Sequence, residues 1–369
     1  MKYWRGFLVA GILAVITWAL TQFAQTHSVL IDMVYPYMTR LIITSLSQWS
    51  SGTAACLWQV LLLLLIGGGV ASIVLMIVLK WNPVQWLGWV LAAVSFMNLL
   101  STGLYGLNEY TGPIAEDIRL TMTDYTVSEL SEATAYYRDK ANALAGEASS
   151  KLTQHTFEEL AEMAGEGFRV LTYEQAISLF AGSTVPVKKL NGGTKGESGV
   201  TVALTGEAAV NTKVPAIAMP FAMCKEMAKR MTISREEEAK YAAYMACIAN
   251  PAPEFQYSGY CIAYYHCYQT LSAIPTTTAQ AAAKELDANI SDTLRRDIAE
   301  YKDFFGAYKE PSGNSFPDML ASWYIQSFIT PLHEQEEDPF NPKDPSKVDL
   351  TYQEPEVTPM EKEDKKKNG

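Results

Sequence analysis

The sequence predicts a mainly α-helical membrane protein, in which three transmembrane helices precede a mostly helical domain with a short β strand or hairpin. One observation is composition: 49% of the 369 residues are hydrophobic and only 19% are charged, whereas soluble domains have about a quarter charged residues. Another is uneven charge, because residues 1–110 carry four basic and two acidic side chains, and the remainder carries 25 basic and 38 acidic ones. The third is a set of long apolar segments near the N-terminus.

Three segments are long and apolar enough to cross a bilayer, which takes about 20 helical residues. They cover about residues 6–23, 56–79 and 84–107. The first could be a signal peptide, but its apolar stretch is long and no small-residue cleavage site follows closely, so we expect a retained anchor. Residues 29–49 are apolar at helical spacing and could lie in the outer membrane interface or pack against the spans. Residues 1–110 are therefore expected to form a membrane anchor in the lipid bilayer.

Basic residues predict the orientation of this anchor, because they are enriched on the cytoplasmic side of membrane helices. Lys2 and Arg5 precede the first span, and Lys80 lies in the short turn between the second and third. Three crossings then give a cytoplasmic N-terminus and an extracytoplasmic domain after residue 107. The acidic balance of that domain leaves no basic face for phosphates, so no nucleic-acid partner is expected.

Residues 111–330 are expected to form the extracytoplasmic domain, with helical patterns over residues 125–144, 155–164, 220–231, 234–248, 254–271, 279–290 and 291–308. Residues 192–206 are rich in glycine and β-branched side chains, which predicts a strand or hairpin. Ser234 and Glu237 have the spacing of a capping box. Residues 331–369 are rich in proline and charge, which predicts a disordered tail.

The chain has five cysteines, and four of them lie in the predicted extracytoplasmic domain, where disulfides can form. Cys224 could pair with Cys247 or Cys261, and buried free thiols are the alternative. Cys261 and Cys267 lie six residues apart on one predicted helix, on different faces, so they are poorly placed to pair with each other. Cys56 lies in a span.

Few recognisable catalytic patterns occur in the chain. His155 and Glu159 stand at i, i+4 and could share a metal, but we favour an exposed pair on a helix face. The sequence has no HExxH motif, no phosphate-binding glycine loop and no G-x-S-x-G elbow.

Two neighbouring strings carry a resemblance to a known family. Residues 220–230 read PFAMCKEMAKR and residues 235–248 read REEEAKYAAYMACI. They resemble the P-F-T-x-C-H-E-x-A-H-Q-x-G and R-E-D-E-A-N-x-x-A-Y-L-A-C-I strings of a bacterial, membrane-anchored domain-of-unknown-function family of HExxH (gluzincin-like) zinc metallopeptidases. Further similar strings follow the family's order: GLNEY at 106–110, TGEAAVN at 205–211 and FQYSGY at 255–260. The resemblance implies a zincin-like fold for the domain and a bacterial cytoplasmic membrane as its location.

The resemblance also implies which residues occupy the family's zinc site. In HExxH peptidases two histidines bind zinc and the glutamate beside the first is the general base. The histidine positions here are Lys225 and Lys229, and the general-base position is Glu226. The third ligand maps to Glu236 or, as the alternative, Glu238, and the residue that orients a histidine maps to Lys240. The chain therefore looks like a degenerate member with KExxK in place of HExxH.

Lysine changes the chemistry expected of that site. A lysine ammonium has no lone pair to give zinc at neutral pH, so we expect no metal cofactor where the family would bind zinc. Lys225 and Lys229 could instead form ion pairs with Glu226, Glu236 and Glu238. On a helix without this resemblance, a K-E-x-x-K string would be a solvated face with i, i+4 pairs.

These observations predict a membrane-anchored pseudo-metallopeptidase that is non-catalytic and binds a peptide, an envelope component or a membrane partner. By analogy with zincins, the predicted strand with Val200, Val202 and Leu204 would offer its edge to an extended peptide. One alternative is an active membrane-bound hydrolase, with a metal held by carboxylates or with Cys224 as nucleophile and His266 as its base. The other is a purely structural membrane subunit.

Overall fold

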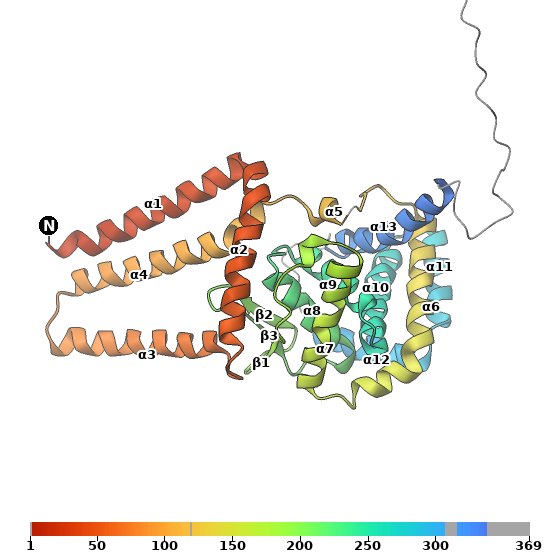
Figure 1. Cartoon of the computed structure of the whole chain (residues 1–369). Coiled ribbons are helices and arrows are strands. Elements are labelled where there is room, and N and C mark those ends of the chain that lie inside the picture. Colours follow the sequence, from red (N-terminus) through yellow and green to blue (C-terminus); the bar gives the residue numbers. More distant parts are fainter. Residues whose placement is uncertain (1, 119, 307–315, 338–369) are drawn as a thin grey trace, which may run out of the picture.

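The computed structural model describes residues 2–118, 120–306 and 316–337. It places three apolar helices on one side of a long fourth helix, and a mostly helical domain on the other side (Figure 1). The predicted mainly helical class is confirmed, together with a small sheet.

Four helices, and not the three predicted, are long and apolar enough to cross a membrane: α1 (Arg5–Thr26), α2 (Ser28–Ser50), α3 (Leu57–Val78) and α4 (Pro83–Leu104). A short 3-10 turn, η1 (Lys2–Trp4), precedes them. The sequence predicted a helix over most of α2 but did not count it as a candidate span, because Asp32, Pro36 and Arg40 interrupt its apolar residues. Judged by length and composition, the predicted count of three candidate spans was therefore wrong.

Helices α1 and α4 pack closely because each has a glycine at their crossing. A Cβ atom added to Gly6 would collide with the backbone of Gly88, and one added to Gly88 would lie 2.8 Å from Cδ2 of Phe7. Small residues at such crossings let two helix backbones approach within a membrane. Helix α3 differs, since none of its residues is buried against the described part of the chain. Trp86 Nε1 of α4 donates a hydrogen bond to Ser72 Oγ of α3, at 3.2 Å.

The domain begins after α4 with short helical segments and continues with longer helices. Their bounds are η2 (Gly106–Tyr110), α5 (Ile114–Asp117), α6 (Val127–Leu152), α7 (Phe157–Arg169), η3 (Val170–Glu174), η4 (Ser178–Phe180), η5 (Ala216–Ala218), α8 (Met219–Arg230), α9 (Glu236–Ala249), α10 (Pro253–Ala273), α11 (Thr277–Ala288), α12 (Asp292–Phe305) and α13 (Phe316–Glu337). Thus the predicted helices are present, and α6 is longer than expected. The first residues of the predicted tail continue α13, and residues 338–369 lie outside the described part of the chain.

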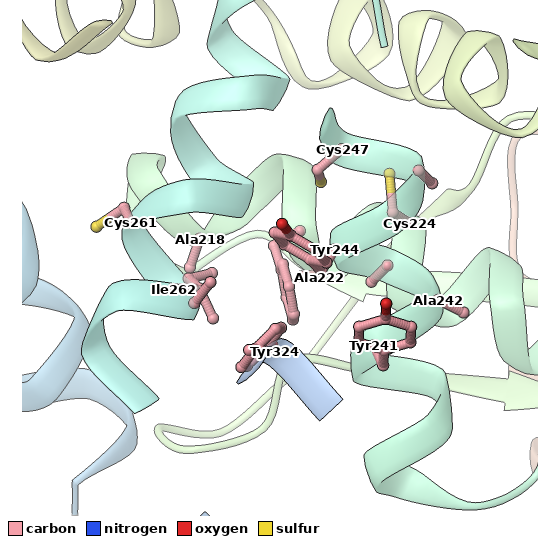
Figure 2. Close-up of a cluster of buried hydrophobic side chains, with 14 of the residues drawn as sticks. Ala218, Ala222, Cys224, Tyr241, Ala242, Tyr244, Cys247, Cys261, Ile262 and Tyr324 are labelled. Atoms are coloured by element: carbon pink, nitrogen blue, oxygen red, sulfur yellow. The ribbon is translucent and has the colours of Figure 1, made fainter. Parts of the chain in front are cut away.

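The core of the domain lies where α8, α9, α10 and α13 meet (Figure 2). Small side chains such as Ala222 and Ala242 are fully enclosed there, beside the rings of Tyr241, Tyr244 and Tyr324. The hydroxyl of the buried Tyr137 donates a 2.6 Å hydrogen bond to the carbonyl oxygen of Tyr324, whereas the hydroxyl of Tyr324 has no hydrogen-bond partner among the described residues. This packing holds α8 and α9 firmly against each other.

The three-stranded sheet has the order β1 (Lys188–Leu190), β3 (Glu207–Asn211), β2 (Gly199–Val202). Strand β1 is parallel to β3, and β2 is antiparallel to it. The predicted segment, residues 192–206, contains strand β2 and the turn to β3; β3 itself lies beyond it, and Leu204 lies in the turn and not in the strand. That turn needs Gly206, whose φ is +65° and whose missing side chain lets the backbone of α2 approach at Ser47.

The start of α9 differs from the prediction. Its N-cap is Arg235, and no side chain caps the helix there, so the predicted capping box of Ser234 and Glu237 is wrong. Complete capping boxes instead begin α6, at Thr126 and Glu129, and α7.

Candidate functional site

The site predicted from the resemblance lies on two adjacent helices, α8 and α9. Pro220 stands in the first turn of α8, where its missing N–H costs no hydrogen bond. Lys229 and Arg230 lie in the last turn, where the helix dipole stabilises positive charge. Thr232, with a φ of +78°, turns the chain toward α9, which begins at Glu236. This short connection brings Glu236 opposite the lysines of α8.

Four residues form what we call the lysine cluster: Lys225, Glu226, Lys229 and Glu236. Nζ of Lys225 lies 2.8 Å from Oε1 of Glu236 and 3.4 Å from Oε1 of Glu226. Nζ of Lys229 pairs with the other oxygen of Glu236, Oε2. Lys225 and Glu226 are buried, while the Glu236 side chain is 26% exposed. The cluster is thus a set of paired charges with one side open to solvent.

Glu226, at the family's general-base position, lies directly beneath β2. The hydroxyl oxygen of Thr201 lies 2.9 Å from both the main-chain carbonyl oxygen and Oε2 of Glu226, and donates its proton to one of them. A Cβ atom added to Gly199 would lie 2.8 Å from Cγ of Glu226, so only glycine fits there. Oε1 of Glu226 is fully buried and accepts no hydrogen bond from any described residue.

Glu236 is the electrostatic centre of the cluster. Burial alone would raise the pKa of its carboxyl group, but the positive charges of Lys225, Lys229 and Lys240 outweigh burial and hold the pKa well below its usual range. Lys240 is buried one helical turn after Glu236. Burial, reinforced by the charge of Lys240, holds the pKa of His266 well below its ordinary value.

Glu238 does not join the lysine cluster. Its Oε1 accepts hydrogen bonds from Nη1 of Arg235, at 2.6 Å, and from the backbone N–H of Ile114, at 3.2 Å. Burial raises the pKa of Glu238, although Arg235 opposes this effect. Arg235 also donates to the carbonyl oxygens of Thr111 and Gly112, so this pair fastens the segment after α4 to the start of α9. Of the two candidate third-ligand positions, the structure brings only Glu236 to the lysines.

Two residues of the N-terminal region hold the end of α8. The hydroxyl of Tyr105, just after α4, donates to the carbonyl oxygen of Lys229 at 3.1 Å. The Nε of Arg40, on α2, donates to the carbonyl oxygen of Met231 at 3.2 Å. The sequence analysis assigned neither residue to the site, because no local pattern links them to α8; a lone arginine in an apolar stretch was the only signal.

The donor set of the cluster does not fit zinc. Two of the three positions that would supply ligands hold ammonium groups, and both ammonium groups pair with the carboxylate at the third. A Zn²⁺ ion there would face positive charge and would have only carboxylate oxygens to bind.

The alternative nucleophile, Cys224, is enclosed in the core. Its sulfur points toward the carbonyl oxygen of Ala164, at 4.0 Å, and contacts Cys247 (Figure 2). His266 instead packs beside the ring of Tyr324. All five cysteines are buried free thiols in the described part of the chain.

The four long apolar helices that precede the mostly helical domain suggest a membrane protein. The chain belongs to the family described as "Protein of unknown function (DUF3810)", whose model matches residues 31–327. No curated protein and no solved structure matches the chain.

Proposed function

We propose that this protein is a membrane-anchored pseudo-metallopeptidase: a non-catalytic, zincin-like domain that binds a peptide, an envelope component or a membrane partner. The observation that carries the proposal is the pairing of Lys225 and Lys229 with Glu236. These residues stand at the positions that would hold zinc in the peptidases that the sequence resembles. Two positive side chains there offset the carboxylates, as a metal cation does in the peptidases.

The state of Glu226 supports a non-catalytic role. A general base must reach a water molecule or a substrate proton, whereas Glu226 is fully buried and takes a hydrogen bond from Thr201. Its oxygen Oε1 faces Lys225 at 3.4 Å. The carboxylate therefore neutralises charge inside the domain.

Strand β2 supports a binding role. It is an edge strand of the sheet within the described residues, and its residues are half-buried. An extended peptide could add to such an edge through backbone hydrogen bonds, with Val200 and Val202 beside it. The Glu226 contact with Thr201 would hold the strand in place for this.

The orientation that we infer has a cytoplasmic N-terminus and an extracytoplasmic domain, in a bacterial cytoplasmic membrane. Lys2, Arg5 and Lys80 lie at the end of the apolar helices that is remote from the domain (Figure 1). Positive residues favour the cytoplasmic side, so the domain would lie on the other side.

Restoring the histidines tests the proposal. The double variant Lys225→His, Lys229→His, purified in detergent, should gain about one zinc per chain, because two imidazoles would then stand near Glu236. The wild-type protein should hold no stoichiometric zinc, measured by elemental mass spectrometry on the same preparation. Each single variant serves as a matched control and should bind zinc far more weakly.

Two results would overturn the proposal. One is stoichiometric zinc in the wild-type protein that is lost in Glu236→Gln, which would show a working metal site. The other is a folded double variant, verified by an unchanged Tm, that binds no more zinc than the single variants.

A further inference from the structure

Helix α2 has two faces of opposite character. The face toward the domain is buried and largely polar; it consists of Ile31, Thr39, Arg40, Ile43, Ser47 and Ser50. The exposed side is mostly apolar: Val29, Leu30, Met33, Val34, Tyr37, Met38, Leu41 and Ile42 recur every three or four residues, and Trp49 follows seven residues later, after the exposed polar Ser45 and Gln48. Residues with this spacing form one stripe along a helix.

The polar face is fastened to the domain from one end of α2 to the other. Asp32 accepts a hydrogen bond from the backbone N–H of Gly112 at 2.9 Å, near the start of the helix. Ser47 and Ser183 share a hydrogen bond of 2.9 Å between their hydroxyl oxygens. At the end, the carbonyl oxygen of Ser50 accepts from Lys188 at 2.8 Å. Asp32 and Ser50 are separated by about 27 Å of helix.

Such a helix cannot cross a bilayer without drawing the domain into it. The domain surface carries exposed charged residues, for example Lys189 and Glu158, whose side chains are 46% and 65% exposed. Charged side chains in the hydrocarbon region are costly. A helix that stays on this domain along its length must therefore remain at the edge of the membrane.

The arrangement of the helices agrees with this argument. Helix α2 lies across the ends of α1, α3 and α4, between them and the domain (Figure 1). We propose that α2 lies in the plane of the membrane surface, with its apolar stripe in the boundary between lipid headgroups and acyl chains, and that only α1, α3 and α4 cross. Tyr37 and Trp49 belong to the residue types enriched at that boundary. The stripe would lie about 5–10 Å into it.

The placement of α2 has a consequence for the lysine cluster, which rests on the proposed binding function. Arg40 of α2 holds the end of α8, and Tyr105 at the end of α4 bonds to Lys229. The cluster therefore lies close to the membrane surface. A ligand of the cluster would be reached at that surface.

Depth measurements along α2 test the proposal in the full-length protein. Cysteine is introduced in turn by Met33→Cys, Leu41→Cys and Trp49→Cys, labelled with a fluorophore, and the protein is placed in phosphatidylcholine–phosphatidylglycerol vesicles. The five native cysteines are buried, which favours labelling at the new site. Spin-labelled lipids with the quencher near the headgroup or deep in the chain then report depth. We expect stronger shallow than deep quenching at all three positions.

The matched control is Leu64→Cys in the middle of α3, which should be quenched most strongly by the deep probe. Deep quenching at Leu41→Cys equal to that at Leu64→Cys, with shallow quenching at the other two α2 sites, would overturn the proposal, because that gradient marks a crossing helix. Reporter fusions to the two chain ends give a second readout. Three crossings place the ends on opposite sides of the membrane, and four crossings place them on the same side. Neither measurement depends on zinc or ligand binding.

Discussion

Two buried ion-pair clusters lie on either side of the sheet and are built differently. The first, which we call the junction cluster, is Lys188 and Glu207, and backbone groups satisfy most of its polar atoms. Lys188 Nζ donates to Glu207 Oε1 at 2.6 Å and to the carbonyl oxygens of Ser50 and Ala55. Glu207 accepts from the backbone N–H groups of Leu57 and Trp58, each at 2.8 Å. It thereby caps α3 and joins the sheet to the membrane helices.

The lysine cluster pairs mainly side chain with side chain and leaves an oxygen of Glu226 without a hydrogen bond from the described residues. Buried polar atoms are nearly always satisfied in proteins. The contrast teaches that the junction cluster is held largely by backbone groups, whereas the lysine cluster is held by side chains with one side open to solvent. Substitutions in the two clusters should therefore change stability by different amounts.

The largest effect is expected from Glu207→Gln in the junction cluster. The variant leaves the ammonium of Lys188 buried without its counter-charge, which costs about 3–5 kcal/mol and lowers Tm by roughly 6–20 °C. Thermal unfolding can be followed with a thiol-reactive dye, because all five cysteines are buried. The control is Glu158→Gln. Glu158 is the exposed ion-pair partner of Lys189, which neighbours Lys188 on β1, so its loss should change stability by under about 1 kcal/mol. Equal shifts for the two variants would contradict a structural joint.

A smaller loss is expected from Glu236→Gln in the lysine cluster. It removes the carboxylate shared by Lys225 and Lys229, but the open side of the cluster lets water solvate them. The cost should fall between those of exposed and buried pairs, at about 2–3 kcal/mol. Glu237→Gln, on the next residue of the same helix, should leave the thermal unfolding temperature unchanged. A Tm for Glu236→Gln as high as that of the control would show that the cluster is not a paired unit.

The pH dependence of stability tests the charge pairing of Glu236. The folded-state pKa of Glu236 lies well below the ordinary value of about 4.3. Between these two pKa values the unfolded chain binds more protons than the folded one. The contribution of Glu236 to stability is therefore fully present above about pH 5 and falls as the pH drops, by up to about 1.4 kcal/mol per pH unit. Glu207 has a lowered pKa for the same kind of reason: burial alone would raise it, but Lys188 and two backbone N–H groups outweigh burial.

Denaturant unfolding of wild type and Glu236→Gln from pH 6 to pH 3 measures this difference. The variant should lose stability more gradually below pH 5, because one of the two shifted groups is gone. Parallel curves for the two proteins would mean that Glu236 titrates normally in the folded protein.

Helices could be predicted from the sequence because their signals are local. Apolar runs gave the ends of α1, α3 and α4 to within three residues, and periodicity gave the helices of the domain. Prediction failed where the outcome depends on tertiary contacts. The helix over residues 29–49 was expected, but its packing on the domain depends on two distant hydrogen bonds: the N–H of Gly112 donates to Asp32, and Arg40 donates to the carbonyl oxygen of Met231. Likewise Ser234 has the spacing of a cap, yet α9 starts beyond it and Arg235 is held by Thr111 and Gly112.

The site was only partly predictable for the same reason. An i, i+4 pattern and a family resemblance pointed to Lys225, Lys229 and Glu236, which the structure brings together. The resemblance favoured Glu236 over Glu238, but both stand in the first turn of α9 and no local signal gave their contacts. Glu238 instead binds a segment more than a hundred residues away, at Ile114. Thr201 and Tyr105 could not be predicted, because nothing in the local sequence indicates which group a hydroxyl side chain will contact.

The smallest effect is expected where the membrane helices meet the lysine cluster. Tyr105→Phe removes the hydroxyl that donates to the carbonyl oxygen of Lys229 but keeps the ring, so about 1 kcal/mol should be lost. Burial, with the nearby charges of Glu226 and Glu236, raises the pKa of Tyr105 far above its ordinary value, so the hydroxyl stays a donor at every pH used. The loss should thus be equal at pH 5 and pH 8, and Tyr173→Phe, at an exposed tyrosine, should lose nothing. A loss that grew toward pH 8 would mean that Tyr105 ionises, and that the end of α4 is not packed against α8.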